Sequence, residues 1–212
     1  MNHDLILWDW NGTLFDDVAW CIRTINAMLA RRNMKPLDGI AAYQQAFCFP
    51  VINYYRNVGF DFTKESFEAL ADEYITLYHS AKTGGSQLYD GAERVLRVMR
   101  ERGIAQVVLS ATKTDHLLSQ MKEFDILYYF DKILGLPDIY ASSKIDVGLD
   151  YMSRKKVRRA VLIGDTEHDA EVARSLCVDC LLIANGHQSR ERLTACGAPV
   201  LENIAQVIEY IH

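Results

Sequence analysis

The chain has 212 residues, of which 50% are hydrophobic and 24% are charged, and its formal net charge is −5. Glycine (12 residues) and proline (4 residues) are scarce, which excludes a collagen-like or a disordered low-complexity chain. The mild acidity argues against nucleic acid as a partner, because a phosphate backbone attracts a basic surface. There is no apolar run of the roughly 20 residues that a membrane span needs, and no signal-peptide pattern. We therefore expect a cytoplasmic protein with no membrane partner.

Short aliphatic runs alternate with helical patterns along most of the chain. The runs are Leu5–Trp8 and residues 106–110, 132–134, 160–163 and 180–184. Nearly continuous apolar runs of this length are typical of strands that are covered on both faces. Between them, apolar residues recur at helical spacing. This alternation of strands and helices predicts an α/β fold with a doubly wound parallel sheet.

Residues 16–87 break the alternation and show only helical patterns. One apolar stripe comprises Val18, Cys21, Ile22, Ile25 and Leu29, and another comprises Phe67, Leu70, Ala71, Tyr74, Leu77 and Tyr78. The pattern predicts an inserted unit of about four helices after the first strand. We expect residues 1–15 and 88–212 to form the core and residues 16–87 to form the insertion. Gly84-Gly85-Ser86 is the expected return hinge.

Four short polar segments stand at the ends of predicted strands or before a predicted helix. They read Asp9-Trp10-Asn11-Gly12-Thr13-Leu14, Ser110-Ala111-Thr112, Ser143-Lys144 and Gly164-Asp165-Thr166-Glu167-His168-Asp169. Ligands of doubly wound sheets bind at the carboxyl ends of the strands, so we expect all four segments to meet at one edge. Taken alone, each has an ordinary explanation: Asp165 suits a turn, Lys144 a solvated loop and Ser110 a helix cap.

Together and in this order, the four segments resemble the motifs of the haloacid dehalogenase superfamily of phosphotransferases. That family carries D-x-D-G-T after its first strand, then a strand-terminal Ser or Thr, then a Lys, and finally G-D-x-x-x-D. The match covers nearly the whole chain, and the insertion stands where phosphoglycolate-phosphatase-like members carry a helical cap. The resemblance implies a phosphatase that hydrolyses a small phosphorylated metabolite through a phospho-aspartate intermediate, with Mg²⁺ as cofactor.

The chemistry of these residues suits phosphoryl transfer. The carboxylate of Asp9 can attack phosphorus and form an acyl phosphate that water later cleaves. Asp9 and Asp165 offer the oxygen ligands that Mg²⁺ prefers. The resemblance adds the backbone carbonyl of Asn11 and the carboxylate of Asp169 to the metal ligands. The phosphate-binding residues that we expect are Ser110, Ala111, Lys144 and Gly12.

The chain departs from the family pattern at Asn11, where phosphatases normally carry a second aspartate that protonates the leaving alkoxide. An amide does not titrate, and loss of such an acid typically costs about 10²–10⁴ in rate. A phosphatase with Asn11 would favour good leaving groups or take the proton from His168, Glu167 or the substrate, with His79 a weaker candidate. We predict Mg²⁺-dependent hydrolysis of an activated aryl phosphate that Asp9→Asn abolishes. We also predict that Asn11→Asp raises the turnover of alkyl phosphates.

Three alternatives stand beside the phosphatase. The first is a module that binds phosphorylated ligands or a protein partner with little or no turnover. The second is a phosphonate hydrolase, which resembles D-x-A-G-T but needs a cap lysine, and no lysine lies between Lys35 and Lys64. The third is a hydrolytic dehalogenase, which resembles D-x-Y-G-T and has no need of Asp165 as a metal ligand.

The predicted cap offers two candidate substrate contacts, Phe49 and Arg56. The guanidinium of Arg56 could bind a substrate carboxylate through two hydrogen bonds. The plainer interpretation places Phe49 in the core of the cap and Arg56 on an ordinary helix surface. His187 follows the turn signal Asn185-Gly186 near the same edge of the sheet, and we interpret it as a loop residue.

Overall fold

One six-stranded parallel sheet forms the centre of the molecule. The computed structural model describes residues 2–80, 87–137 and 143–212. The strands follow the spatial order β3-β2-β1-β4-β5-β6. They are β1 (Leu5–Trp8), β2 (Ala105–Lys113), β3 (Lys132–Leu136), β4 (Ala160–Gly164), β5 (Asp179–Ile183) and β6 (Val200–Leu201). The predicted parallel α/β sheet is confirmed. Strand β6 was not predicted, because two residues are too few to give a pattern.

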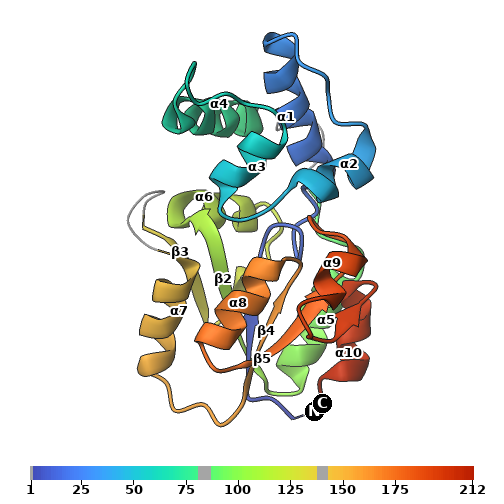
Figure 1. The fold of residues 1–212 in the computed structure, drawn as a ribbon. Helices are drawn as coiled ribbons and strands as arrows, with labels where there is room; N and C mark the ends of the chain where they lie inside the picture. The colour runs from blue at the N-terminus through green and yellow to red at the C-terminus, as the bar shows by residue number, and fades with distance from the viewer. Residues whose placement is uncertain (1, 81–86, 138–142) are drawn as a thin grey trace.

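Helices cover both faces of this sheet (Figure 1). They are α5 (Ala92–Glu101), α6 (Thr114–Lys122), α7 (Lys144–Ser153), α8 (Glu167–Ser175), α9 (Arg190–Thr194) and α10 (Val207–Tyr210). Two 3₁₀ turns, η2 (Leu127–Tyr129) and η3 (Ile204–Gln206), complete the described helical segments of the core. At the C-terminus, η3 continues directly into α10.

The alternation of side chains along β1 explains the two layers. Ile6 and Trp8 pack in the cluster that contains α5, α6 and α10, whereas Leu5 and Leu7 pack in the cluster that contains α8 and residues of α7. All four side chains are buried. Because neighbouring strand residues point to opposite faces, this run must be apolar throughout.

Four helices lie beyond the carboxyl ends of the strands (Figure 1). They are α1 (Val18–Arg31), α2 (Gly39–Ala46), α3 (Val51–Asn57) and α4 (Phe67–Ser80), and we call them the cap. Trp20 of α1 stacks on Tyr78 of α4, with ring centroids 4.5 Å apart. These helices fall within the predicted insertion, while the predicted hinge at 84–86 lies outside the described residues. None of the helices in the described ranges is long and apolar enough to cross a membrane.

Candidate active site

Two aspartates follow neighbouring strands and share one hydroxyl. Asp9 comes directly after β1 and Asp165 directly after β4, and these strands pair along their whole length. The Thr13 hydroxyl lies 3.0 Å from Oδ1 of Asp165 and 3.4 Å from Oδ2 of Asp9. The sheet order reverses between β1 and β4, which is where ligands of doubly wound folds bind. The fold therefore brings both predicted carboxylates to one point.

A capping box aims the third aspartate at the same point. At the start of α8, Oδ2 of Asp169 accepts hydrogen bonds from the Thr166 hydroxyl at 2.6 Å and the Thr166 N–H at 3.0 Å. The backbone N–H of Asp165 donates to the same oxygen at 3.2 Å. These donors fix the carboxylate and leave Oδ1 free to face the neighbouring side chains. One carboxylate oxygen each from Asp9, Asp165 and Asp169 lies within 4.8 Å of the others.

Lys144 connects the aspartates from the other side. Its ammonium lies 2.5 Å from Oδ1 of Asp9 and 2.5 Å from Oδ1 of Asp169, and its side chain is 3% exposed. A capping box formed by Ser143 and Asp146 sets the start of α7, so Lys144 occupies the first helical position. Burial alone would lower the pKa of Lys144, but Asp169 and Asp9 together raise it above its ordinary value. We call Asp9, Lys144, Asp165 and Asp169 the charged floor.

The charged floor has an excess of negative charge that a divalent cation would balance. Burial raises the pKa of Asp9 to about 6 despite the nearby Lys144 ammonium. Burial also raises the pKa of Asp165 to about 7, since the charges of Asp9 and Asp169 offset the lowering by His187. For Asp169, Lys144 outweighs burial and lowers the pKa. Three buried carboxylates beside one lysine are an oxygen-rich donor set, which fits Mg²⁺.

Gly12 provides space for the floor and is not placed to bind phosphate. A Cβ at this position would lie 2.2 Å from Oδ2 of Asp165, and the backbone has φ +75°. Its N–H donates to the carbonyl of Phe15 at 2.9 Å and to Oδ1 of Asp17 at 3.1 Å. Gly12 is absent from the described residues that line the cavity. The predicted phosphate contact is therefore replaced by two hydrogen bonds inside the chain.

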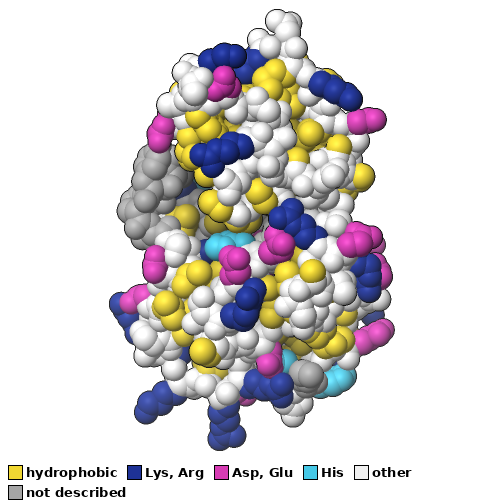
Figure 2. Space-filling model, viewed as in Figure 1, with side chains coloured by type: hydrophobic (Ala, Val, Ile, Leu, Met, Phe, Trp, Pro, Cys, Tyr) yellow, Lys and Arg dark blue, Asp and Glu magenta, His cyan; other side chains and the backbone are white. Residues whose placement is uncertain are grey.

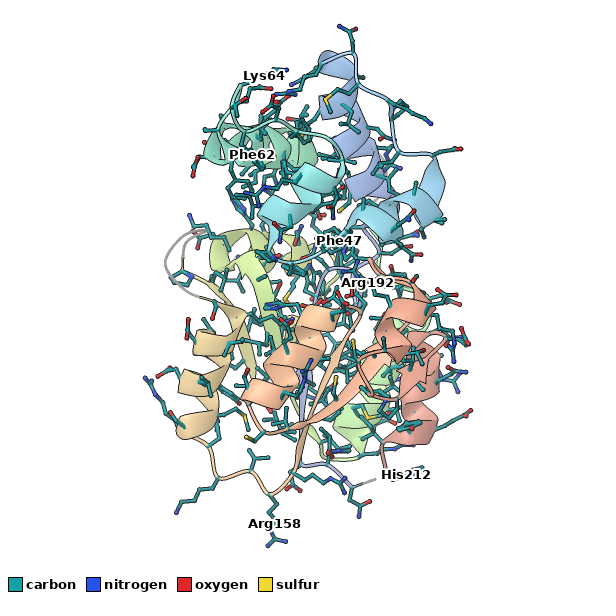
Figure 3. The ribbon with its side chains drawn as sticks, in the orientation of Figure 1. Phe47, Phe62, Lys64, Arg158, Arg192 and His212 are labelled. Atoms are coloured by element: carbon teal, nitrogen blue, oxygen red, sulfur yellow. The ribbon has the colours of Figure 1, made fainter. Side chains whose placement is uncertain are left out.

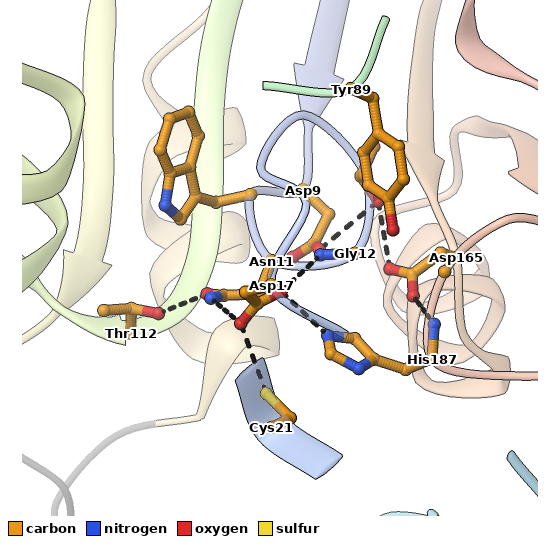
Figure 4. Close-up of polar contacts among 12 residues, drawn as sticks. Asp9, Asn11, Gly12, Asp17, Cys21, Tyr89, Thr112, Asp165 and His187 are labelled. Carbon is orange, nitrogen blue, oxygen red and sulfur yellow. Dashed lines mark hydrogen bonds and ion pairs between the residues drawn. The ribbon is translucent and has the colours of Figure 1, made fainter. Parts of the chain in front are cut away.

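The amide of Asn11 is held by three neighbours. Its nitrogen donates to Oδ2 of Asp17 at 2.8 Å, and its oxygen accepts from the Thr112 hydroxyl at 2.7 Å (Figure 4). The same nitrogen donates to the Tyr78 hydroxyl at 3.3 Å. Tyr78 belongs to the cap and Thr112 to β2, so the amide joins the two parts of the molecule. A carboxylate at position 11 would face the carboxylate of Asp17 directly. The amide donor is thus matched to its surroundings.

Asp17 and His187 are site residues that the sequence analysis missed. The His187 imidazole lies 3.4 Å from Oδ1 of Asp17 and shares a 2.8 Å hydrogen bond with the Tyr43 hydroxyl. Its backbone N–H donates to Oδ2 of Asp165 at 2.6 Å. Burial would lower the pKa of His187, but the charge of Asp17 raises it to about 9. The position of His187 after the β5 turn was the available signal, while nothing in the sequence marked Asp17.

A cavity of about 330 Å³ separates the charged floor from the cap. Ser110, Ala111 and Thr112 line it at the end of β2, as the motif predicts. Figure 2 shows a histidine side chain exposed at the junction of the cap and the core. The cap residues that line the cavity include five aromatic side chains, Tyr43, Phe47, Phe49, Tyr74 and Tyr78, which we call the aromatic wall.

The two predicted substrate contacts have different places. Phe49 lines the cavity and stacks on His168, with ring centroids 4.7 Å apart. Arg56 is exposed, donates to Oδ1 of Asn53 at 2.8 Å and lies over the ring of Phe62. Arg56 is also absent from the described residues that line the cavity. The structure therefore brings Phe49 to the site and leaves Arg56 on the cap surface.

The predicted proton carriers also differ in whether they line the cavity. His168 and His79 line the cavity, and His79 shares a 3.2 Å hydrogen bond with His116. Glu167 instead accepts a 2.6 Å hydrogen bond from Arg192. The same guanidinium donates to the backbone carbonyl of Phe47 at 2.7 Å (Figure 3). Arg192 thus ties the aromatic wall to the core.

Known proteins resemble this chain over nearly its whole length. The phosphoglycolate phosphatase of Caulobacter vibrioides is 25% identical over 216 residues, which cover 94% of this chain and 88% of that protein. The phosphoglycolate phosphatase of Rhodobacter capsulatus is 24% identical, with coverages of 86% and 85%. A haloacid dehalogenase-like hydrolase from Streptococcus pneumoniae has the same fold, with a TM-score of 0.83, 19% identity and coverages of 98% and 97%. A predicted phosphatase from Clostridium acetobutylicum gives a TM-score of 0.79 at 23% identity, with coverages of 99% and 98%.

A sequence model of a known protein family matches most of this chain. The model, described as haloacid dehalogenase-like hydrolase, matches residues 6–183, which is well over half of the chain. That range contains all four motif segments, and the structure gathers them around one cavity. The chain belongs to the haloacid dehalogenase-like hydrolase family.

Proposed function

We propose that the protein is a Mg²⁺-dependent phosphatase of a small phosphorylated molecule. The observation that carries the proposal is the buried carboxylate of Asp9, which lines the cavity and lies 2.5 Å from the Lys144 ammonium. Asp165 and Asp169 stand beside it in an arrangement that suits an oxygen-bound cation. The names of the relatives agree with this class of reaction, since they are phosphoglycolate phosphatases.

The reaction begins with the nucleophile. A carboxylate oxygen of Asp9 attacks phosphorus and forms an O–P bond, while the bond between phosphorus and the leaving oxygen breaks. Water then attacks the phosphorus of the acyl phosphate, and the bond between phosphorus and the Asp9 oxygen breaks. One proton of the water passes to solvent, inorganic phosphate leaves and the carboxylate returns. Phosphoryl transfer depends mainly on positioning and on charge stabilisation. In this chain Lys144 supplies the positive charge, and Ser110 lines the cavity, so its hydroxyl is the proposed hydrogen-bond donor to the phosphate.

The carboxylates of Asp9, Asp165 and Asp169 would hold the Mg²⁺, together with the backbone carbonyl of Asn11. The ion supplies positive charge to the phosphoryl oxygens when it is bound. Thr13 orients the first two carboxylates, and the capping box of α8 orients the third. Because these donors are buried and fixed, the site is organised before substrate arrives.

The test is phosphate release from phenyl phosphate by the wild-type protein and by Asp9→Asn. We expect release with Mg²⁺, none with EDTA, and a loss of at least roughly 10⁴-fold in the variant, because the nucleophile is missing. An acid-quenched sample analysed by mass spectrometry should carry a phosphoryl group on the peptide that contains Asp9. The matched control is Asp16→Asn, because Asp16 bonds to Gln87 and is absent from the described cavity lining.

Two results would contradict the proposal. One is a folded, Mg²⁺-loaded wild-type protein that releases no more phosphate than Asp9→Asn from any phosphate ester or acyl phosphate. That result would favour a module that binds phosphorylated ligands without turnover. The other is an equal loss of activity in Asp16→Asn and Asp9→Asn, which would show that the loss does not come from removing the Asp9 nucleophile.

A further inference from the structure

On the side of the cavity that faces the charged floor, the described residues include no lysine and no arginine. Among the described residues lining the cavity, the lysines are Lys113 and Lys144, and there is no arginine. Both lysines belong to the core, because Lys113 ends β2 and Lys144 begins α7. Lys113 also lies 3.7 Å from the carboxylate of Asp115. The histidines of the lining already have partners: His187 pairs with Asp17, His79 bonds to His116, and His168 lies 3.2 Å from Glu171. A carboxylate on the organic part of a substrate would therefore meet rings and no lysine or arginine, which is costly in a buried site.

The aromatic wall consists of two groups of rings on the cap. Tyr43 stacks on Phe47 with ring centroids 5.4 Å apart, and Phe47 meets Phe49 edge to face at 5.5 Å. Tyr74 and Tyr78 stack at 6.0 Å with their ring planes 20° apart. All five rings line the cavity. Aromatic side chains arranged in this way favour another ring, by stacking or by edge-to-face contact.

The hydroxyls of the two most buried tyrosines in this wall are already used inside the protein. The Tyr43 hydroxyl is bonded to His187, and the Tyr78 hydroxyl donates to Oδ2 of Asp17 at 2.8 Å. These bonds leave the rings themselves as the contact surface for a ligand. The volume of about 330 Å³ lies at the small end of ligand pockets, so it suits a phosphate with one ring.

An independent observation concerns the leaving group. The Asn11 amide beside the nucleophile is held by Asp17, Tyr78 and Thr112 and carries no titratable proton. A phenolate leaves without protonation far more easily than an alkoxide, because a phenol has a pKa near 10 and an aliphatic alcohol is about as weak an acid as water, near 16. A site with an amide at this position therefore favours a phosphate ester of an aromatic hydroxyl.

We propose that the substrate is a small aryl phosphate monoester whose ring lies against the aromatic wall while its phosphate lies on the charged floor. The inference rests on the proposed phosphatase function and adds the class of the organic group. It also separates this protein from its relatives named as phosphoglycolate phosphatases, since phosphoglycolate carries a carboxylate and no ring.

Four substrates separate the effect of the ring from that of the leaving group. Phenyl phosphate has both the ring and a good leaving group, and acetyl phosphate has a good leaving group without a ring. Ethyl phosphate and 2-phosphoglycolate have neither. We expect kcat for phenyl phosphate to exceed that for ethyl phosphate and for 2-phosphoglycolate by at least about 100-fold. We expect acetyl phosphate to match phenyl phosphate in kcat but to show a KM about tenfold higher.

The variant that tests the wall is Phe49→Leu, with Phe62→Leu as its matched control. Both phenylalanines are half-buried in the cap, but Phe62 packs on Phe67 and lies away from the junction of cap and core (Figure 3). Phe49→Leu should raise KM for phenyl phosphate about tenfold and leave KM for acetyl phosphate unchanged. Phe62→Leu should change neither value.

The outcomes distinguish this inference from the proposed function. Turnover of 2-phosphoglycolate or ethyl phosphate at a rate equal to or above that of phenyl phosphate would overturn the inference and leave the phosphatase in place. A KM for acetyl phosphate that rises as much as that for phenyl phosphate in Phe49→Leu would also overturn it, because the effect would not depend on a ring. Failure of all four substrates in the wild-type protein would remove the proposed function itself.

Discussion

The charged floor and the aromatic wall face each other across one cavity but differ in origin. The floor comes from residues at strand ends and helix starts, where capping boxes and parallel pairing fix each side chain. The wall comes from α2, α4 and the segment between α2 and α3, and it is held mainly by packing between rings. We infer that the floor sets the reaction and the wall sets the choice of substrate. Four variants, in order of falling effect, test this division.

Of these four variants, the largest effect is expected at Lys144. Replacing Lys144 with Met removes the positive charge from the floor and leaves the carboxylates of Asp9 and Asp169 facing each other. We expect kcat for phenyl phosphate to fall about 10²–10³-fold, as when a preorganised charge donor is lost. The control is Lys113→Met, which removes the other lysine of the described cavity lining. Equal losses in the two variants would show that general positive charge, not the buried contact with Asp9, supports the reaction.

The second effect revises the expectation drawn from the sequence for Asn11. The Asn11→Asp variant places a second carboxylate against Oδ2 of Asp17, where the amide now donates at 2.8 Å. We expect a loss of about 3 kcal/mol in the free energy of unfolding, measured by urea denaturation, and no gain in alkyl phosphate turnover. The double variant Asn11→Asp/Asp17→Asn again pairs one carboxylate with one amide. It should regain part of the lost stability, because it also removes the Asp17 charge that pairs with His187, and it should hydrolyse ethyl phosphate faster than the wild-type protein.

A gain of activity in the single variant would contradict this expectation. It would mean that the carboxylate at position 11 escapes Asp17, by turning toward the cavity or by remaining protonated. Above pH 9, where the ion pair of His187 with Asp17 no longer contributes, a double variant that is no more stable than the single one would show that Asp17 is not the source of the conflict.

The sequence predicted the floor much better than the wall, and the reason is physical. Asp9, Lys144 and Asp165 stand at fixed offsets from strand and helix ends, so local patterns place them near one another. Asp17 and His187 are 170 positions apart in the sequence, and their ion pair exists only because α1 and the β5 loop meet in three dimensions. The aromatic residues of the wall follow the same apolar spacing as those of the cap core. A hydrophobic pattern does not reveal which rings line a cavity.

The third effect concerns the junction between floor and cap and depends on pH. The pKa of His187 is raised from 6.5 to about 9, because the charge of Asp17 outweighs the lowering of this pKa by burial. A raised pKa in the folded state means that the ion pair contributes fully below pH 6.5 and is lost as the pH rises through 9. Relative to the His187→Gln variant, the wild-type protein should lose on the order of 2 kcal/mol of unfolding free energy between pH 6.5 and 9.

Urea denaturation in EDTA at several pH values measures this difference. Asp17 does not make the free energy of unfolding depend on pH in that range, because its pKa lies below its ordinary value. The His187 charge and the hydrogen bonds to Asp17 outweigh the effect of burial on that pKa. Asp165, with a pKa of about 7, keeps its hydrogen bond to the backbone N–H at position 187 in both proteins. The His187 charge also lowers the pKa of Asp165, so Asp165 contributes more to the pH dependence of the variant and makes the difference between the two curves smaller. Parallel curves for the wild-type protein and the variant would contradict a charged His187.

The smallest effect is expected where the core holds the wall. Arg192 donates to the Phe47 carbonyl at 2.7 Å and to Glu167 at 2.6 Å, so it fixes the backbone of the wall relative to α8. In Arg192→Lys one ammonium cannot keep both contacts with the geometry of the guanidinium, and the rings become less well positioned. We expect KM for phenyl phosphate to rise about threefold with kcat unchanged, because one hydrogen bond to the wall is weakened while the charged floor is intact.

The control for this prediction is Arg190→Lys, because the Arg190 guanidinium pairs with Glu202 on the core surface. If the two variants raise KM equally, the change comes from α9 as a whole, and the wall does not depend on this contact. If Arg192→Lys lowers kcat and leaves KM unchanged, the floor and the wall are coupled, and the division of labour between them fails.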